Sequence, residues 1–397
     1  MKRILILNGT ISEIPIIKKA QEMGYYVITT GNMSELPGHQ LSDKYIEADY
    51  SNEHEILRLV KENDIEGIIS CANDFGSITA SYVGEQMGWK GHDTYANALL
   101  MHRKDKLMDY FKRKGVPASW YEIFDDANKA KSFCKMQKCV YPIMVKANDL
   151  TGGKGILRAD NYGEACKAID QAFTVSRDKH VLIEPYLKGI QQSIVVFLID
   201  RKIAITSSSD IYCMRNPYLV QAETYPATDF KRVEPKLHQI IEDMAQDLQL
   251  VDGIFSFQYI VENGVPYIID MMRRNFGNET LLMADEMTGF PWEEAYIRAS
   301  LGLPCKGLDC NKNQTKYCGH YGVMAEKNGV FEKYILPQTI LDRVFKITDN
   351  MKKGDVINNY LTQKIAHIYF KYDDFDLMKR EVLRYNQLVY IEMGNGK

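Results

Sequence analysis

The 397-residue sequence predicts an α/β protein of two or three domains. Short apolar runs that end at glycine alternate with helical periodicity over the first hundred residues. The composition, 45% hydrophobic and 25% charged residues, is ordinary for a globular protein. A strand–helix alternation of this kind is typical of βαβ units, in which helices pack on a parallel sheet. We therefore expect the chain to open with such a domain.

The first domain is expected to contain three strands and three helices. Ser12 and Pro15 favour a helix start, and Gly24 favours a helix end. The run 67–71 is short, apolar and bounded by polar residues, as expected for a buried strand. The predicted strands are 3–7, 25–30 and 67–71, and the predicted helices are 14–21, 53–61 and 78–87.

The middle of the chain opens with a helix over Lys104–Lys114, which Gly115-Val116-Pro117 terminates. Its apolar residues recur at helical spacing, whereas the later β-rich runs alternate or are continuously apolar. Further predicted strands are 143–147, 181–183, 194–198, 202–207, 255–261 and 365–372; further predicted helices are 128–138, 163–173, 234–248 and 376–385.

Charge and hydropathy exclude several classes of protein. The formal net charge of −3 and a pI near 6.3 provide no field that attracts nucleic acid or anionic lipid, so neither is expected as a partner. The longest strongly apolar run, Ile194–Ile199, is too short to span a membrane. The apolar stretch after Lys2-Arg3 ends at Asn8, which is too early for a signal peptide. The sequence thus predicts a cytoplasmic protein.

The eight cysteines are scattered and form no Cys-x-x-Cys pair. Cys305, Cys310 and Cys318 come closest together, with His320 nearby, but zinc sites usually have tighter, paired spacing. Free thiols are therefore the preferred interpretation.

A glycine-rich segment follows the predicted strand that ends at Lys146. It reads Lys-Ala-Asn-Asp-Leu-Thr-Gly-Gly-Lys-Gly over residues 146–155. Glycines let the backbone approach an anion closely and turn its N–H groups toward it, and the lysine can reach a phosphate. The segment is not a P-loop, because Gly-x-x-x-x-Gly-Lys-Ser/Thr is absent. A flexible hairpin turn remains the alternative.

A hairpin is predicted around Asn263-Gly264, which separates two β-rich runs. Polar Gln258 and Asp270 interrupt these apolar runs. A two-residue turn would place the two side chains on opposite faces, whereas a three-residue loop starting at Glu262 would place them diagonally on one face. Only the second register makes a shared site, and a hairpin with one solvated face is the alternative.

Taken in order, these segments resemble the ATP-grasp superfamily, in particular its branch with biotin carboxylase, carbamoyl phosphate synthetase and the glycinamide ribonucleotide synthetases. The resemblance covers residues 1 to about 300. It implies a Rossmann-like precursor domain (1–100), an ATP-grasp α+β domain (101–304) with a mobile glycine-rich subdomain (about 118–187), and a small C-terminal α+β closing domain (305–397). The matching motifs are Asp105-Lys106, Pro142–Lys146, the glycine-rich segment, Glu184-Pro185-Tyr186-Leu187 and the hairpin with Arg274.

The resemblance also implies residue roles. Arg274 would stabilise charge on the transferred phosphoryl group, and Lys146 would share this catalytic role while neutralising the phosphates of ATP. Asp270 would bind Mg²⁺ or Mn²⁺, with Gln258 as a weaker candidate ligand. The segment Asn73-Asp74-Phe75 would supply part of the acceptor site. The implied ATP-binding residues are Lys106, Lys146, Gly152, Gly153, Lys154, Gly155, Glu184, Pro185, Tyr186, Leu187 and Gln191.

Departures from the family pattern concern the metal site and the nucleotide. Relatives usually have Glu at position 258 and often Asn at position 272, where this chain has Gln and Met. Gln258 keeps an oxygen but loses a charge, and the Met272 thioether is a poor magnesium ligand. Asn275, Asn278 or Glu279 could compensate. Gln191 stands near the position where relatives carry a ribose-binding Glu, and Ala147 stands where they often carry Pro.

The implied function is a ligase that activates a small-molecule carboxylate as an acyl phosphate and joins it to an amine. A homodimer is compatible with the resemblance. An ATP-binding module with little ligase activity is the alternative, because the metal set is weakened. A nicotinamide-dependent oxidoreductase is disfavoured because Gly-x-Gly-x-x-Gly is absent. The loop Arg215–Tyr218 either caps the acceptor substrate or is a surface loop, and Arg273 either binds a substrate carboxylate or is a surface charge.

Overall fold

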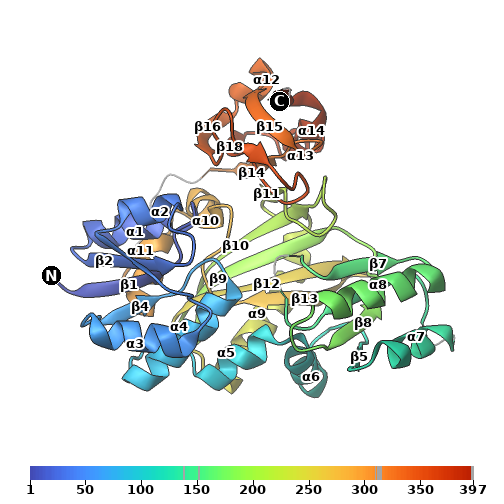
Figure 1. Ribbon diagram of the computed structural model, residues 1–397, viewed down its shortest axis with the longest axis horizontal. Coiled ribbons are helices and arrows are strands. Elements are labelled where there is room, and N and C mark those ends of the chain that lie inside the picture. The colour runs from blue at the N-terminus through green and yellow to red at the C-terminus, as the bar shows by residue number, and fades with distance from the viewer. Residues whose placement is uncertain (137–138, 151–152, 309, 311–314, 395–397) are drawn as a thin grey trace.

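The computed structural model describes residues 1–136, 139–150, 153–308, 310 and 315–394. Figure 1 shows the N-terminal domain on one side, the glycine-rich subdomain on the opposite side and a large sheet between them. The C-terminal strands and helices lie above this sheet in the same view. The architecture is a mixed α/β fold with several sheets, as the sequence predicts.

The N-terminal domain contains a parallel four-stranded sheet of order β3-β2-β1-β4. Leu5 and Leu7 of β1 pack in one core cluster, and Ile4 and Ile6 pack in another, because successive side chains of a strand face opposite sides. The elements are β1 (Arg3–Leu7), α1 (Ile14–Glu22), β2 (Tyr26–Gly31), α2 (Pro37–Leu41), β3 (Lys44–Glu47), α3 (Glu53–Glu62), β4 (Gly67–Ile69) and α4 (Asp74–Met87).

Two helices, α5 (Tyr95–His102) and α6 (Lys104–Lys114), connect this domain to the glycine-rich subdomain. Gly115 ends α6 in the left-handed conformation with φ 66°, which glycine adopts without a Cβ clash. The predicted and observed bounds of this helix are the same.

The glycine-rich subdomain has its own four-stranded sheet of order β5-β8-β6-β7. Ala165, Ala168, Ile169 and Ala172 of α8 are buried, which lets this helix pack closely on the sheet. The elements are β5 (Glu122–Phe124), α7 (Ala127–Lys135), β6 (Ile143–Ala147), β7 (Ile156–Ala159), α8 (Tyr162–Val175) and β8 (Val181–Pro185).

The central sheet has eight strands in the order β13-β12-β9-β10-β11-β14-β18-β16. Its last three strands come from the C-terminal region, so this region extends the central sheet. The strands are β9 (Gln191–Ile199), β10 (Lys202–Tyr212), β11 (Ala222–Tyr225), β12 (Gly253–Glu262), β13 (Val265–Met272), β14 (Tyr317–Val323), β16 (Val344–Asp349) and β18 (Ala366–Tyr372).

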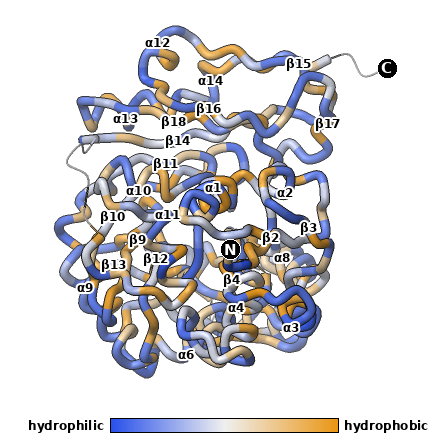
Figure 2. The backbone as a smooth tube through the Cα atoms, turned by 90° about the vertical axis from the view of Figure 1, so that its left-hand side faces the viewer, coloured by the Kyte–Doolittle hydropathy of each residue, from blue (hydrophilic) through white to orange (hydrophobic). Residues whose placement is uncertain are grey.

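The remaining helices and a small sheet of order β17-β15-β19 surround these strands. Figure 2 shows the C-terminal elements as a layer above the N-terminal domain. No helix in the described ranges is long and apolar enough to cross a membrane. The elements are α9 (Phe230–Asp247), α10 (Thr280–Thr288), α11 (Trp292–Ser300), β15 (Gly329–Ile335), α12 (Gln338–Leu341), β17 (Val356–Ile357), α13 (Phe375–Val382), α14 (Tyr385–Leu388) and β19 (Tyr390–Gly394).

The β12–β13 hairpin pairs Gln258 with Asp270, a register that neither of the two turns considered from the sequence gives by itself. Glu262 pairs with Val265, so the loop has two residues, and both Asn263 and Gly264 have positive φ as in a type I′ turn. Of the two turns that the sequence leaves open, the structure has the two-residue turn. A bulge that skips Ile269 shifts the register, and Gln258 pairs directly with Asp270. The two side chains share a face because of the bulge.

Candidate active site

A cavity of about 460 Å³ lies where the glycine-rich subdomain, the central sheet, the start of α4 and the C-terminal region meet. Predicted site residues that line it are Lys146, Gly153, Glu184, Pro185, Tyr186, Leu187, Gln191, Gln258, Asp270 and Arg274. We call the end between β6, β8 and β12 the nucleotide end, and the end near β11, β14 and β18 the far end. The cavity thus joins segments that lie far apart in the chain.

A buried ion pair occupies the nucleotide end. Met144 of β6 pairs with Glu184 of β8, and Lys146 lies two residues further along the same face of the sheet. The Lys146 ammonium contacts the Glu184 carboxylate, and both residues are buried. The carboxylate predicted to accept from adenine is therefore bound to the lysine, and it fixes that lysine at the cavity wall.

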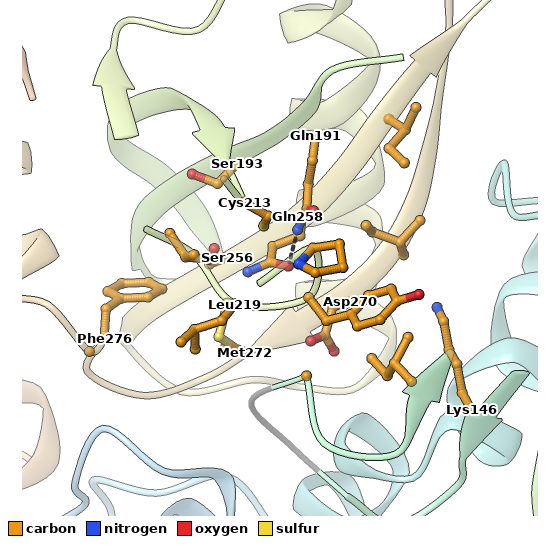
Figure 3. Close-up of a pocket in the computed structure, with 18 of the residues that line it drawn as sticks. Lys146, Gln191, Ser193, Cys213, Leu219, Ser256, Gln258, Asp270, Met272 and Phe276 are labelled. Carbon is orange, nitrogen blue, oxygen red and sulfur yellow. Dashed lines mark hydrogen bonds between the residues drawn. The ribbon is translucent and has the colours of Figure 1, made fainter. Parts of the chain in front are cut away.

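The segment after β8 forms the rest of this wall. The Tyr186 N–H donates to the Pro142 carbonyl at 3.0 Å, so this amide is already engaged. The Arg158 guanidinium lies 4.3 Å from the centre of the Tyr186 ring, which is a cation–π distance. Gln191 Nε2 donates to Gln258 Oε1 at 2.8 Å, as the dashed line in Figure 3 shows. Gln191 thus orients Gln258.

Part of the glycine-rich segment folds against the cavity, while Gly152 lies outside the described residues. Gly153 has φ 75°, and a Cβ there would lie 2.1 Å from the Tyr218 carbonyl oxygen. Gly155 has φ 67°, and its Cβ would lie 2.8 Å from the Cβ of Ala147. Lys154 is exposed. Both glycines are therefore required by conformation and by space.

The loop that contacts Gly153 is the segment 215–220. The Tyr218 hydroxyl accepts from the Arg158 N–H at 2.7 Å, which connects the central sheet to the subdomain. Residues 217–220 line the cavity. This loop is one wall of the pocket.

Lys106 lies away from the cavity, and Lys104 lies at it. Lys106 is exposed on α6 and is not among the lining residues. Two helical positions differ by about 200°, so side chains two residues apart point in opposite directions. Lys104 lines the cavity and donates to the Leu150 carbonyl at 2.9 Å. The geometry therefore favours Lys104 for the role assigned to Lys106.

Arg274 joins two domains at the cavity floor. Its Nε lies 2.5 Å from Asp74 Oδ1, and Asp74 is the first residue of α4 in the N-terminal domain. Burial raises the pKa of Asp74, but the Arg274 guanidinium outweighs this effect and keeps the pKa below its usual value. Arg274 is consequently a positively charged side chain that Asp74 fixes in position at the cavity.

Arg273 has neither of its predicted roles. Its Nε lies 2.8 Å from Asp93 Oδ2, and its two terminal nitrogens donate to the carbonyls of Ile254 and Val251. The side chains of Arg273 and Asp93 are each 6% exposed. This arginine is a buried structural residue, because every contact is to the protein interior.

The candidate metal site contains one carboxylate, Asp270. Gln258 lies opposite it, and Ser256 lies opposite Met272 one step along the same face (Figure 3). No group of three or more His, Cys, Asp or Glu side chains suited to a metal occurs in the described part of the chain. Mg²⁺ is commonly held by one or two carboxylates together with substrate phosphates and water. Asp270 and Gln258 therefore fit such an ion only when phosphates complete the shell.

The far end holds functional candidates that the sequence did not reveal. Glu223 of β11 is buried and accepts from His320 Nε2 at 2.7 Å and from Ser209 Oγ at 2.9 Å. Burial raises the pKa of Glu223, but these donors lower it below its usual value overall. Lys364 and Cys213 line the same end. A polar residue within an apolar strand was the available signal for Glu223 and His320.

Comparison with known proteins finds matches to part of the sequence. Residues 103–212 match the model "Phosphoribosylglycinamide synthetase, ATP-grasp (A) domain". A phosphoribosylamine–glycine ligase of Clostridium acetobutylicum is 35% identical over 103 residues, which is 25% of this chain and 24% of that protein. The carbamoyl phosphate synthase large chain of the same organism is 22% identical over 332 residues, 80% of this chain and 30% of that protein.

Two solved structures share the fold of this chain over its whole length. The L-amino acid ligase of Bacillus licheniformis superposes with a TM-score of 0.82 at 15% identity, covering 100% of this chain and 99% of that one. Phosphoribosylglycinamide synthetase of Anaerococcus prevotii gives a TM-score of 0.77 at 18% identity, covering 99% and 100%.

The match of residues 103–212 to an ATP-grasp domain model, and the fold shared over the whole length, agree with the resemblance to the ATP-grasp superfamily in the branch of the phosphoribosylglycinamide and carbamoyl phosphate synthetases. The chain matches about a quarter to a third of the length of these two curated relatives.

Proposed function

We propose that the protein is an ATP-dependent ligase that joins a small-molecule carboxylate to an amine. One observation carries the proposal: a single cavity brings together Lys104, Lys146, Arg274 and Asp270. These are three cations and one metal-binding carboxylate, which is the set that phosphoryl transfer requires for charge neutralisation. The relatives that the comparisons name as ligases support the same class of reaction.

Two steps account for the chemistry. A carboxylate oxygen attacks the γ-phosphorus, the bond between the γ-phosphorus and the β–γ bridging oxygen breaks, and ADP leaves. An amine nitrogen then attacks the acyl carbon, inorganic phosphate leaves, and the nitrogen loses a proton. Mg²⁺ or Mn²⁺ bound at Asp270 and Gln258 would neutralise phosphate charge in the first step. The reaction uses no side-chain nucleophile.

Each cavity residue has a distinct task in this scheme. Glu184 holds Lys146 in place, leaving the remaining ammonium hydrogens to meet phosphate oxygens. Arg274, held by Asp74, opposes the charge that develops on the transferred phosphoryl group. Gly153 brings its backbone to the mouth of the cavity and helps to exclude water, which would hydrolyse the acyl phosphate.

An ATP-binding module with little turnover is the second candidate. The observation that favours it is the neutral pair Gln258 and Met272 beside the single carboxylate Asp270. Tight binding of ATP with magnesium, together with no ADP formation on any acid and amine, would support the module and contradict the ligase.

The test of the nucleotide site compares two lysines of the same helix. We expect Lys104→Met to weaken ATP binding at least tenfold in calorimetry with magnesium, because a phosphate-facing cation is lost. The matched control Lys106→Met removes an equal charge from the exposed face of α6 and is expected to leave binding unchanged. ADP release with a panel of acids and amines then reports turnover. The opposite pattern between the two variants would contradict the site.

A further inference from the structure

Lys364 lies at the far end of the cavity and has no acidic partner. It lines the cavity, and its Nζ donates to Asn278 Oδ1 at 2.7 Å. Within the described residues, no carboxylate forms an ion pair with it; Glu223 acts on it only at longer range. Asn278 is neutral, so no carboxylate of the described residues is in direct contact with this ammonium group. A half-buried charge without a direct ionic partner is costly, which calls for an explanation.

The surroundings hold Lys364 in this position. Its aliphatic stem lies over Gly322 of β14, where a Cβ would come within 2.8 Å of Lys364 Cδ. Asn278 Oδ1 also accepts from His367 Nε2 at 3.1 Å, which fixes the amide that orients the ammonium. Gly322 leaves space for the Lys364 side chain, and the Asn278 amide fixes the position of its ammonium group.

The backbone beside this contact is strained. Asn278 and Glu279 both have positive φ, 60° and 52°, although neither is glycine. Lys346 pairs with Glu279, and the Tyr369 hydroxyl donates to the Asn278 carbonyl, so C-terminal strands hold both residues in place. Strain that several contacts maintain is characteristic of functional sites. Here it places the Asn278 side chain against Lys364.

We propose that Lys364 binds an anionic group, a carboxylate, of the second substrate at the far end of the cavity. The inference rests on the proposed function and deepens it by naming the substrate class: a small molecule with a carboxylate that remains unreacted. Arg274 and Lys364 line one continuous cavity, so a substrate held at Lys364 has its reacting group directed toward the phosphate site. An amino acid and a dicarboxylic acid share this chemistry.

Glu223 gives this end its second charge. Its carboxylate lines the cavity beside Lys364 and already accepts from Ser209, Tyr225 and His320. An amino acid would place an ammonium group toward Glu223, whereas a dicarboxylic acid would bring a second negative charge near it. The two sources of the carboxylate can therefore be separated by experiment.

The test measures the thermal midpoint of the full chain with four probes: glycine, succinate, and their neutral amides glycinamide and succinamide. We expect glycine or succinate to raise the midpoint and the corresponding amide to leave it unchanged. Lys364→Met is expected to abolish this rise, Lys364→Arg to retain it, and Gly322→Ala to reduce it by displacing the lysine. Lys353→Met, an exposed lysine of the same region, is the matched control.

A rise with glycine alone identifies an amino acid, and a rise with succinate alone identifies a dicarboxylic acid. The proposal is overturned if neither acid shifts the wild type, if the amides act equally, or if Lys364→Met responds like the wild type. ATP with magnesium is measured in parallel, and we expect it to shift all variants alike. A wild type that responds to ATP but to neither acid refutes this inference alone, whereas a wild type that does not respond to ATP refutes the proposed function.

Discussion

Each end of the cavity holds one lysine, and the two lysines differ in their partners: Lys146 is buried in an ion pair, whereas Lys364 is half-buried without one. At the nucleotide end, Lys146 is paired with Glu184, and both side chains are less than a tenth exposed. At the far end, the Lys364 ammonium donates to the neutral amide of Asn278 and lacks an ion pair in the described ranges. The charge of Lys146 is balanced by Glu184 without a ligand, whereas the charge of Lys364 is balanced when an anionic substrate group binds. The protein therefore preforms one end and leaves the other to its substrate.

The largest expected effect on stability comes from removing one partner of the Lys146–Glu184 ion pair. Lys146→Met leaves the Glu184 carboxylate buried without its partner, so we expect a loss of about 3–5 kcal/mol in the free energy of unfolding. Urea denaturation at pH 7 measures this loss. The double variant Lys146→Met with Glu184→Leu removes both charges and is expected to regain most of the stability without regaining ATP affinity. Equal instability of the single and double variants would contradict the pairing.

Lys364, at the end without an ion pair, should make the stability of the folded protein depend on pH. Burial lowers the pKa of Lys364 to about 8, and the charges of Glu223 and Cys213 oppose this only partly. Between pH 8 and the ordinary lysine pKa near 10.5, the unfolded chain binds more protons than the folded one, so stability rises with pH. We expect wild type to gain about 1–3 kcal/mol over this window relative to Lys364→Met. Parallel pH profiles of the two proteins would contradict the uncompensated charge.

The smallest effect concerns the metal site between the two ends. Gln258→Glu places a second carboxylate opposite Asp270, where it adds charge for a hard cation. We expect magnesium to bind the ATP-loaded protein about tenfold more tightly, which corresponds to about 1.4 kcal/mol. Calorimetry with magnesium measures the change, and Gln249→Glu on the exposed surface is the matched control. Unchanged affinity would argue against a metal at this pair.

The parts of the site that the sequence predicted are local. Lys146 follows a continuously apolar strand, and the glycines after it have positive φ where the structure describes them. Asn263-Gly264 likewise forms the turn of the expected hairpin. Such features depend on neighbouring residues alone, so spacing and residue type were enough to find them.

The parts that were missed depend on angles and on distant strands. Lys104 and Lys106 are both near a helix start, and only the helix orientation separates them. The bulge at Ile269 restores the shared face of Gln258 and Asp270, and no residue in β13 announces it. Glu223 and Lys364 line the same end of the cavity because β11 pairs with β14, and β14 pairs with β18, which Lys364 precedes. The β11–β14 pairing spans about a hundred residues, and periodicity does not contain it.

The continuity of the central sheet has a mechanical consequence. Strand β14 is hydrogen-bonded to β11 and to β18. The β18 region next to Lys364 and strand β13 with Asp270 therefore belong to one continuous sheet. The sheet of the glycine-rich subdomain is separate from both. A movement of that subdomain would therefore change the width of the cavity mouth without displacing Lys364 or Asp270 relative to each other.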